Sequence, residues 1–169
     1  MLVAARYPVV VGAVVSIQGN FTLNDAFWSA NLGRLTAAEA TKEIAVLRDF
    51  PAKWVGNSMP NPSEEQVSSA IDWLNFQPVS TLKAIGRLFL ETTDVPENLD
   101  TSRAVLENVS VSLIAGERSR SECDVPEWAI SGARSFHVIS GAGHLVPIEP
   151  PVEIATLINA ASLAVELEA

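Results

Sequence analysis

The chain has 169 residues, of which 48% are hydrophobic and 18% charged, and its formal net charge at pH 7 is −9. This length suits one domain with a substantial core, and the excess of acidic residues argues against binding to nucleic acids or anionic membranes. A single cysteine, Cys123, excludes an internal disulfide framework and indicates a reducing, cytoplasmic compartment. The two histidines and Cys123 lack the spacing of metal ligands, so no metal site is expected.

The first 15 residues are mostly apolar, but they do not read as a membrane span or a signal peptide. Arg6, Pro8 and Gly12 interrupt the apolar run, which is shorter than the roughly 20 residues that a span requires. No basic region precedes the run and no convincing cleavage site follows it. We therefore expect the end of a helix, a turn at Pro8, and a strand from Val9 to Ile17 that is apolar enough to be covered on both faces.

The middle of the chain, residues 36–93, predicts three helices. Thr36 and Glu39 have the spacing of a capping box, which opens a helix that Pro51 stops. The other two helices are expected to begin at N-cap serines, Ser63 and Ser80.

The next segment, residues 94–132, returns to the pattern of a strand with short flanking elements. Residues 94–108 read as a linker with a short helical turn. The apolar run from 109 to 115 predicts a strand that ends at Gly116, and residues 126–132 predict a brief helix.

A short strand ending near residue 139 leads into the loop Gly141-Ala-Gly-His144. The two glycines allow a sharp turn and leave the imidazole of His144 beyond the end of the strand. Such a loop suits a general base, because the sheet positions the side chain while the loop exposes it. A histidine in an ordinary turn is the alternative. Pro150 and Pro151 then open a final apolar-periodic helix.

This C-terminal stretch resembles the end of an α/β-hydrolase domain. The shared features are a strand, Gly-x-Gly-His, a proline, Glu-x-Pro and a closing helix, here represented by Gly141, Gly143, His144, Pro147, Glu149, Pro151 and Ile158. The resemblance implies an α/β fold that forms part of such a domain, with about three parallel strands and flanking helices. It assigns residues 1–29 and 94–169 to this core and residues 30–93 to a helical cap inserted after the first strand.

The resemblance makes His144 the base of a triad of nucleophile, acid and histidine. Neither position at which the family carries the acid holds a carboxylate here: Gln18 follows the first strand, and Ser119 follows the second. We expect the amide oxygen of Gln18 to accept the proton on His144 Nδ1, or else Gln18 bonds only loop backbone, and Asp25 is the alternative acid. The residues expected to bind substrate are Asn20, Phe27 and Trp28.

The nucleophile elbow of the family, Gly-x-Ser-x-Gly, does not occur in this chain. The resemblance therefore implies hydrolysis of an ester or a related small-molecule substrate, with His144 as general base, by a truncated or split enzyme that is inactive alone. No cofactor is expected, because the family mechanism needs none and no glycine-rich phosphate loop occurs.

In the family, the strand that follows the elbow lies beside earlier strands of the sheet, and this chain contains no counterpart of those strands. The first strand would therefore present an unpaired apolar edge, which promotes self-association or pairing with another chain. The alternative function is accordingly a catalytically silent interaction module that pairs through this edge.

Overall fold

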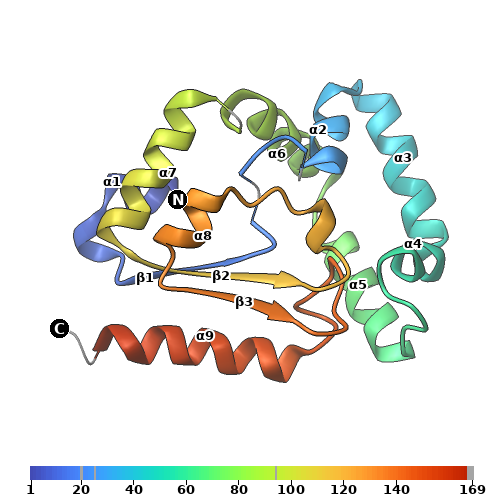
Figure 1. The fold of residues 1–169 in the computed structure, drawn as a ribbon. Helices are drawn as coiled ribbons and strands as arrows, with labels where there is room; N and C mark the ends of the chain where they lie inside the picture. The colour runs from blue at the N-terminus through green and yellow to red at the C-terminus, as the bar shows by residue number, and fades with distance from the viewer. Residues whose placement is uncertain (20, 25, 94, 167–169) are drawn as a thin grey trace. The chain divides into compact units, whose positions relative to one another are not determined.

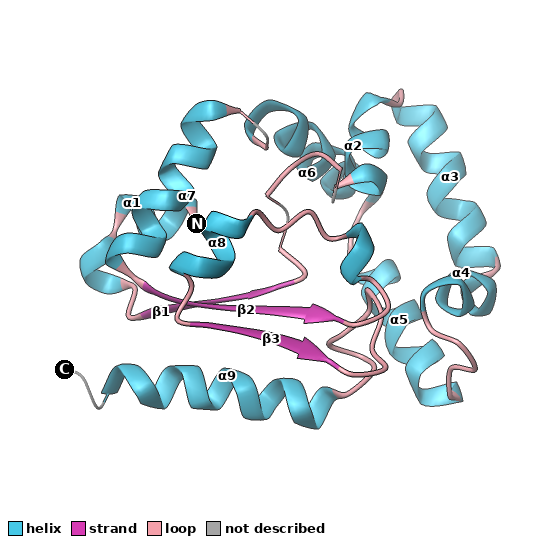
Figure 2. Ribbon diagram, viewed as in Figure 1, coloured by secondary structure: helices cyan, strands magenta, loops and turns pink. Residues whose placement is uncertain are grey.

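A computed structural model describes residues 1–19, 21–24, 26–93 and 95–166. Within these residues the fold is α/β, with nine α-helices and one three-stranded sheet (Figure 2). The chain forms two compact units, Met1–Asp25 with Asp94–Ala169 and Ala26–Thr93. The boundary expected from the sequence was between residues 29 and 30. No helix among the described residues is both long and apolar enough to cross a membrane.

The sheet of the first unit consists of β1 (Ala13–Ile17), β2 (Ser110–Gly116) and β3 (Ser135–Ile139), in the order β1-β2-β3. All pairings are parallel, and the register places Ile17 opposite Ile114. The prediction of about three parallel strands is confirmed. Because the strands are parallel, the loops that follow them start from one edge of the sheet, which is where parallel sheets hold their functional side chains.

Helices cover both faces of this sheet. Figure 1 shows α1 (Leu2–Arg6), α7 (Pro96–Asn108) and α8 (Glu127–Gly132) on one face and α9 (Pro151–Glu166) on the other. Two short 3₁₀ helices, η1 and η2, complete this unit and span Pro8–Val10 and Arg120–Glu122.

Alternate residues of β2 supply the two hydrophobic cores of this unit, since successive side chains of a strand point to opposite faces. On the side of α7 and α8, Val111 and Leu113 pack with Ala4, Val105, Leu106 and Ala129. On the side of α9, Ile114 packs with Ile139, Val146 and Ile154. This double coverage explains why β2 is buried at every position after Ser110.

The second unit consists of five helices: α2 (Phe27–Arg34), α3 (Ala37–Asp49), α4 (Pro51–Ser58), α5 (Glu64–Phe76) and α6 (Val79–Thr92). The predicted capping box opens α3, because the Thr36 hydroxyl accepts from Glu39 N and the Glu39 carboxylate accepts from Thr36 N at 2.8 Å. Ser63 caps α5 in the same way, as predicted. The core of this unit is formed by Leu32, Ala40 and Ile44.

Helices α2 and α6 approach each other at a pair of glycines. A Cβ atom added to Gly86 would lie 2.2 Å from the carbonyl oxygen of Ser29, and one added to Gly33 would lie 2.5 Å from the carbonyl carbon of Gly86. The two backbones are therefore in direct contact, which only glycine permits at these positions.

Several predicted boundaries are wrong. Val9 and Val10 belong to η1 rather than to a strand, because Pro8 fixes a helical φ at the first position of that turn. Pro51 ends α3 but also opens α4, as proline commonly does at the first helical position. The third helix of the middle segment begins at Val79, so Ser80 lies inside it. The expected linker over residues 94–108 is largely helix α7.

Candidate active site

His144 stands in the loop that leads from β3 to α9. The chain turns at Gly141, whose φ is +68°, a value that favours glycine. The following residues Ala142 and Gly143 are buried, whereas His144 is exposed. The loop can lie close to the sheet because β2 ends in Gly116, where an added Cβ would be 2.2 Å from the carbonyl oxygen of Gly143. Local sequence therefore places the imidazole at the sheet edge and leaves it accessible to solvent.

Glu149 holds this loop from its C-terminal side. One carboxylate oxygen accepts from the backbone N–H of Gly143 at 2.8 Å, and the other accepts from Arg118 Nη2 at 2.7 Å. The Glu149 side chain is only 8% exposed, whereas that of Arg118 is 35% exposed. Arg118 also donates to the carbonyl oxygen of Gly141. Arg118 and Glu149 together therefore hold the backbone of the loop at Gly141 and Gly143.

Glu117 holds the start of the same loop. Its carboxylate accepts from Gly141 N at 2.7 Å and from the Ser140 hydroxyl at 3.1 Å. Both hydrogen bonds favour the ionised carboxylate, so the pKa of Glu117 lies below its usual value, the Gly141 N–H being the larger cause. The loop before His144 is thus fixed at both ends by charged side chains that follow β2 or precede α9.

Gln18, at the end of β1, joins the same network. Its Nε2 donates to the Ser119 hydroxyl at 2.7 Å and to the carbonyl oxygen of Gly143 at 3.1 Å, while its Oε1 accepts from Cys123 Sγ at 2.7 Å. A carbonyl oxygen can only accept, so the amide group that faces Gly143 must be the NH₂. Gln18 has a φ of +50°, which is uncommon outside glycine, and its three hydrogen bonds help to sustain that conformation.

The structure brings together three of the positions that the sequence singled out. Gln18 and Ser119, at the two positions where the resemblance to α/β hydrolases predicts an acid, are hydrogen bonded to each other, and Gln18 contacts the residue before His144. Among the described residues no side chain hydrogen bonds to the imidazole of His144. The expected bond from Gln18 Oε1 to Nδ1 is not made, because this oxygen accepts from Cys123 Sγ instead.

The remaining predicted site residues are placed as follows. Asp25 and Asn20 lie outside the described residues. Phe27 begins α2, and the position of its side chain is not described. Trp28 lies on α2, where it packs against the core of Leu32, Ala40 and Ile44. The substrate-binding role of these side chains stays a prediction.

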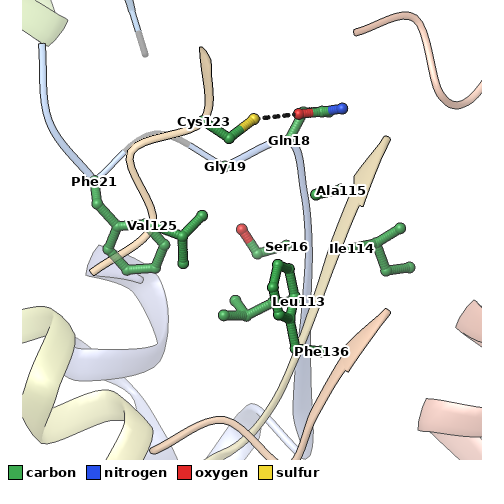
Figure 3. Close-up of a pocket in the computed structure, with 10 residues that line it drawn as sticks. All are labelled: Ser16, Gln18, Gly19, Phe21, Leu113, Ile114, Ala115, Cys123, Val125 and Phe136. Atoms are coloured by element: carbon green, nitrogen blue, oxygen red, sulfur yellow. Dashed lines mark hydrogen bonds between the residues drawn. The ribbon is translucent and has the colours of Figure 1, made fainter. Parts of the chain in front are cut away.

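A small pocket adjoins Gln18 on the side of the sheet that faces α8. Figure 3 shows Phe21 and Val125 on one side of it, Leu113 and Phe136 on the other, and Cys123 directed at the Gln18 amide. Its volume is ≈ 10 Å³, about the space of one water molecule. The pocket is too small for an ester substrate, and His144 is not among the residues that line it.

No described serine stands on a strand-to-helix elbow. Ser119 is 4% exposed and its hydroxyl is bonded to the Gly116 carbonyl and to Gln18, and the Ser140 hydroxyl is bonded to Glu117. In the described ranges no three His, Cys, Asp or Glu side chains cluster as metal ligands would. The site as described therefore offers an exposed imidazole on a fixed loop.

Sequence reasoning missed Arg118, Glu117 and Cys123, and it gave Glu149 no role. A weak signal was present, because Glu117 and Arg118 come directly after the strand that ends in Gly116, where side chains reach the sheet edge. No protein-family model matches this chain, and no curated protein matches it.

Proposed function

We propose that this chain contributes the general base to the hydrolysis of an ester or a related small acyl or alkyl substrate. In this proposal His144 accepts the proton of an attacking hydroxyl or water, and the chain does not itself supply a covalent nucleophile. The substrate is a small molecule bound against the sheet edge.

One observation carries the proposal: the ends of β1 and β2 and the side chain of Glu149 all contact Gly143, the residue before His144. Gln18 after β1 donates to the Gly143 carbonyl oxygen, Gly116 of β2 packs against the same oxygen, and Glu149 accepts from the Gly143 N–H. A general base needs a fixed position relative to the reacting atom together with access to it. The fixed backbone before an exposed imidazole supports both requirements.

The network also supports a role for Gln18 as a positioning residue. Its amide ties the end of β1 to the His144 loop without carrying charge, so the loop is oriented but an imidazolium gains no ionic stabilisation from Gln18. A low activity relative to enzymes with a carboxylate at this place follows from the proposal.

The proposal is tested by hydrolysis of p-nitrophenyl acetate by the purified chain, its His144→Gln variant and its His137→Gln variant. His137 is the matched control because it is the other histidine of the chain and lies on β3, one loop away. Without a nucleophile the chain should be inactive on ordinary esters, but this activated ester can be attacked by water directly. We therefore expect slow, steady release of nitrophenol without an initial burst, since no acyl-enzyme forms. We also expect the rate above buffer to disappear in His144→Gln and to persist in His137→Gln.

Two outcomes would overturn the proposal. Equal rates for the parent chain and His144→Gln would mean that the imidazole is not the base. A burst equal to the protein concentration would mean that the chain holds a nucleophile and acts as a complete enzyme.

A further inference from the structure

The strand β1 lies at one edge of the sheet. Within the described residues it pairs with β2 alone, in parallel, and no strand lies on its other side. All five of its residues are partly exposed, in contrast to the buried residues of β2.

The pattern of hydrogen bonds identifies which backbone groups of β1 face outward. The N–H of Gln18 donates to the carbonyl oxygen of Ile114 at 2.9 Å, with Ile17 opposite Ile114 in the register. In a parallel ladder alternate residues of a strand bond to the same neighbour. The even-numbered residues therefore face β2, and the N–H and C=O groups of Ala13, Val15 and Ile17 point away from the sheet.

This edge lacks the usual protection against pairing. Natural edge strands are shielded by charged side chains, prolines or bulges, but β1 reads Ala-Val-Val-Ser-Ile, and no Asp, Glu, Lys or Arg occurs between Tyr7 and Asn24. The apolar character continues just before the strand, where Val9 is 94% and Val10 is 76% exposed.

We propose that this edge binds a second copy of the chain, through two β1 strands that pair antiparallel about a two-fold axis at Val15. Ala13 then lies opposite Ile17 of the other copy, and Val15 lies opposite Val15. Each of these opposed pairs exchanges two hydrogen bonds. The three outward N–H and three outward C=O groups of each strand are thereby all satisfied, which no shift of the register by one residue would achieve. This pairing does not depend on the chemistry of His144.

Charge distribution favours a second copy at this surface. The chain carries 20 acidic and 11 basic residues, so most contacts between copies bring like charges together. An isologous contact places the same patch on both sides, and here that patch is uncharged. The strand can therefore meet its own copy without electrostatic repulsion inside the contact.

The size of the contact predicts a weak dimer. Five residues of strand extend about 17 Å, and with covering layers about 10 Å away on each face the contact measures roughly 340 Å² per copy. A standard interface buries about 800 Å² per partner. The dimer should accordingly form in a concentration-dependent equilibrium with the monomer.

The test combines sedimentation velocity over a range of protein concentrations with residue-resolved amide hydrogen exchange at the two ends of that range. We expect monomer at low and dimer at high concentration. The amides of Ala13, Val15 and Ile17 should exchange several-fold more slowly in the dimer, whereas those of Val14, Ser16 and Gln18 should be slow in both states because they bond to β2.

A proline at position 15 sharpens the test. Val15→Pro removes an outward N–H without removing a bond to β2, and Val15→Ala shortens the same side chain but keeps the N–H. We expect Val15→Pro to remain monomeric and Val15→Ala to dimerise like the parent chain.

Several results would overturn the proposal. A monomer at all concentrations would do so, as would a dimer whose Ala13, Val15 and Ile17 amides stay unprotected, since it would use another surface. Protection of these amides in the monomer would mean that the chain covers its own edge. Should Val15→Pro fail to fold, the exchange data on the parent chain decide the question alone.

Discussion

Removal of the Glu149 carboxylate should destabilise the first unit strongly, because this side chain is nearly buried and accepts from both Gly143 N and Arg118. Glu149→Ala leaves the N–H of Gly143 without its acceptor in a buried position, and an unsatisfied buried donor costs about 1–3 kcal/mol. It also removes the ion pair with Arg118. Because Arg118 is 35% exposed and can be hydrated, that loss should add only about 1 kcal/mol.

The two effects together predict a decrease of about 3 kcal/mol in the free energy of unfolding. Urea denaturation of the variant measures this change through the shift of the midpoint. Glu149→Gln should lie between the parent chain and Glu149→Ala, because an amide oxygen can still accept one hydrogen bond but carries no charge.

Glu153→Ala is the matched control, since it removes an exposed carboxylate from the first turn of α9. Loss of its favourable interaction with the helix N-terminus should cost at most about 1 kcal/mol. Equal shifts for Glu149→Ala and Glu153→Ala would refute the reasoning, because Glu149 would then act only as a surface charge.

Three further predictions concern other parts of the chain. Gly86→Ala should lower the free energy of unfolding by about 1–3 kcal/mol through the clash between helix backbones. Gly56→Ala, whose Cβ would meet nothing within 4 Å, should instead raise it by about 0.5–1 kcal/mol. Thermal melts measure both changes, and equal shifts of the melting temperature would contradict the close packing of α2 and α6. Gln18→Glu should destabilise the fold by about 1–3 kcal/mol, since a carboxylate would oppose the Gly143 carbonyl where an NH₂ now donates; unchanged stability in urea would argue against that hydrogen bond. The pKa of the Glu117 carboxyl is depressed in the folded chain, so its contribution to stability is complete above the ordinary carboxyl pKa of 4.5 and is lost as pH falls through the lower folded value. Glu117→Gln should therefore remove part of the acid-induced loss of stability. Identical acid denaturation profiles for the variant and the parent chain would show that hydrogen bonds do not hold the carboxylate.

The elements predicted best from the sequence are those whose signals are local. The capping box of Thr36 and Glu39 needs only four consecutive residues, and Ser63 and the Pro150–Pro151 pair act within one helical turn. Their energies do not depend on distant parts of the chain, and the corresponding helices were predicted with nearly correct starts.

The elements predicted worst depend on packing. Helix α7 contains several polar and charged residues, and its Val105 and Leu106 make a short apolar stripe that becomes significant only against Val111 and Leu113 of the sheet. Tertiary burial therefore decided a segment whose intrinsic preference was weak.

The candidate site likewise has one part that the sequence predicts and one part that it does not. The loop around His144 could be predicted because glycines and prolines mark it in consecutive positions. Its support could not, because Arg118 and Glu149 are 31 residues apart and Gln18 is 125 residues from Gly143. Parallel strands bring such residues to one edge, and the sequence alone does not show which side chains meet there.

The most direct test of the central claim is the effect of D₂O on the difference in ester hydrolysis between the parent chain and His144→Gln. A general base takes a proton from water in the transition state, so the difference should be clearly smaller in D₂O than in H₂O. No difference between the two chains in H₂O, or a difference of the same size in D₂O, would contradict the assignment of His144 as the general base.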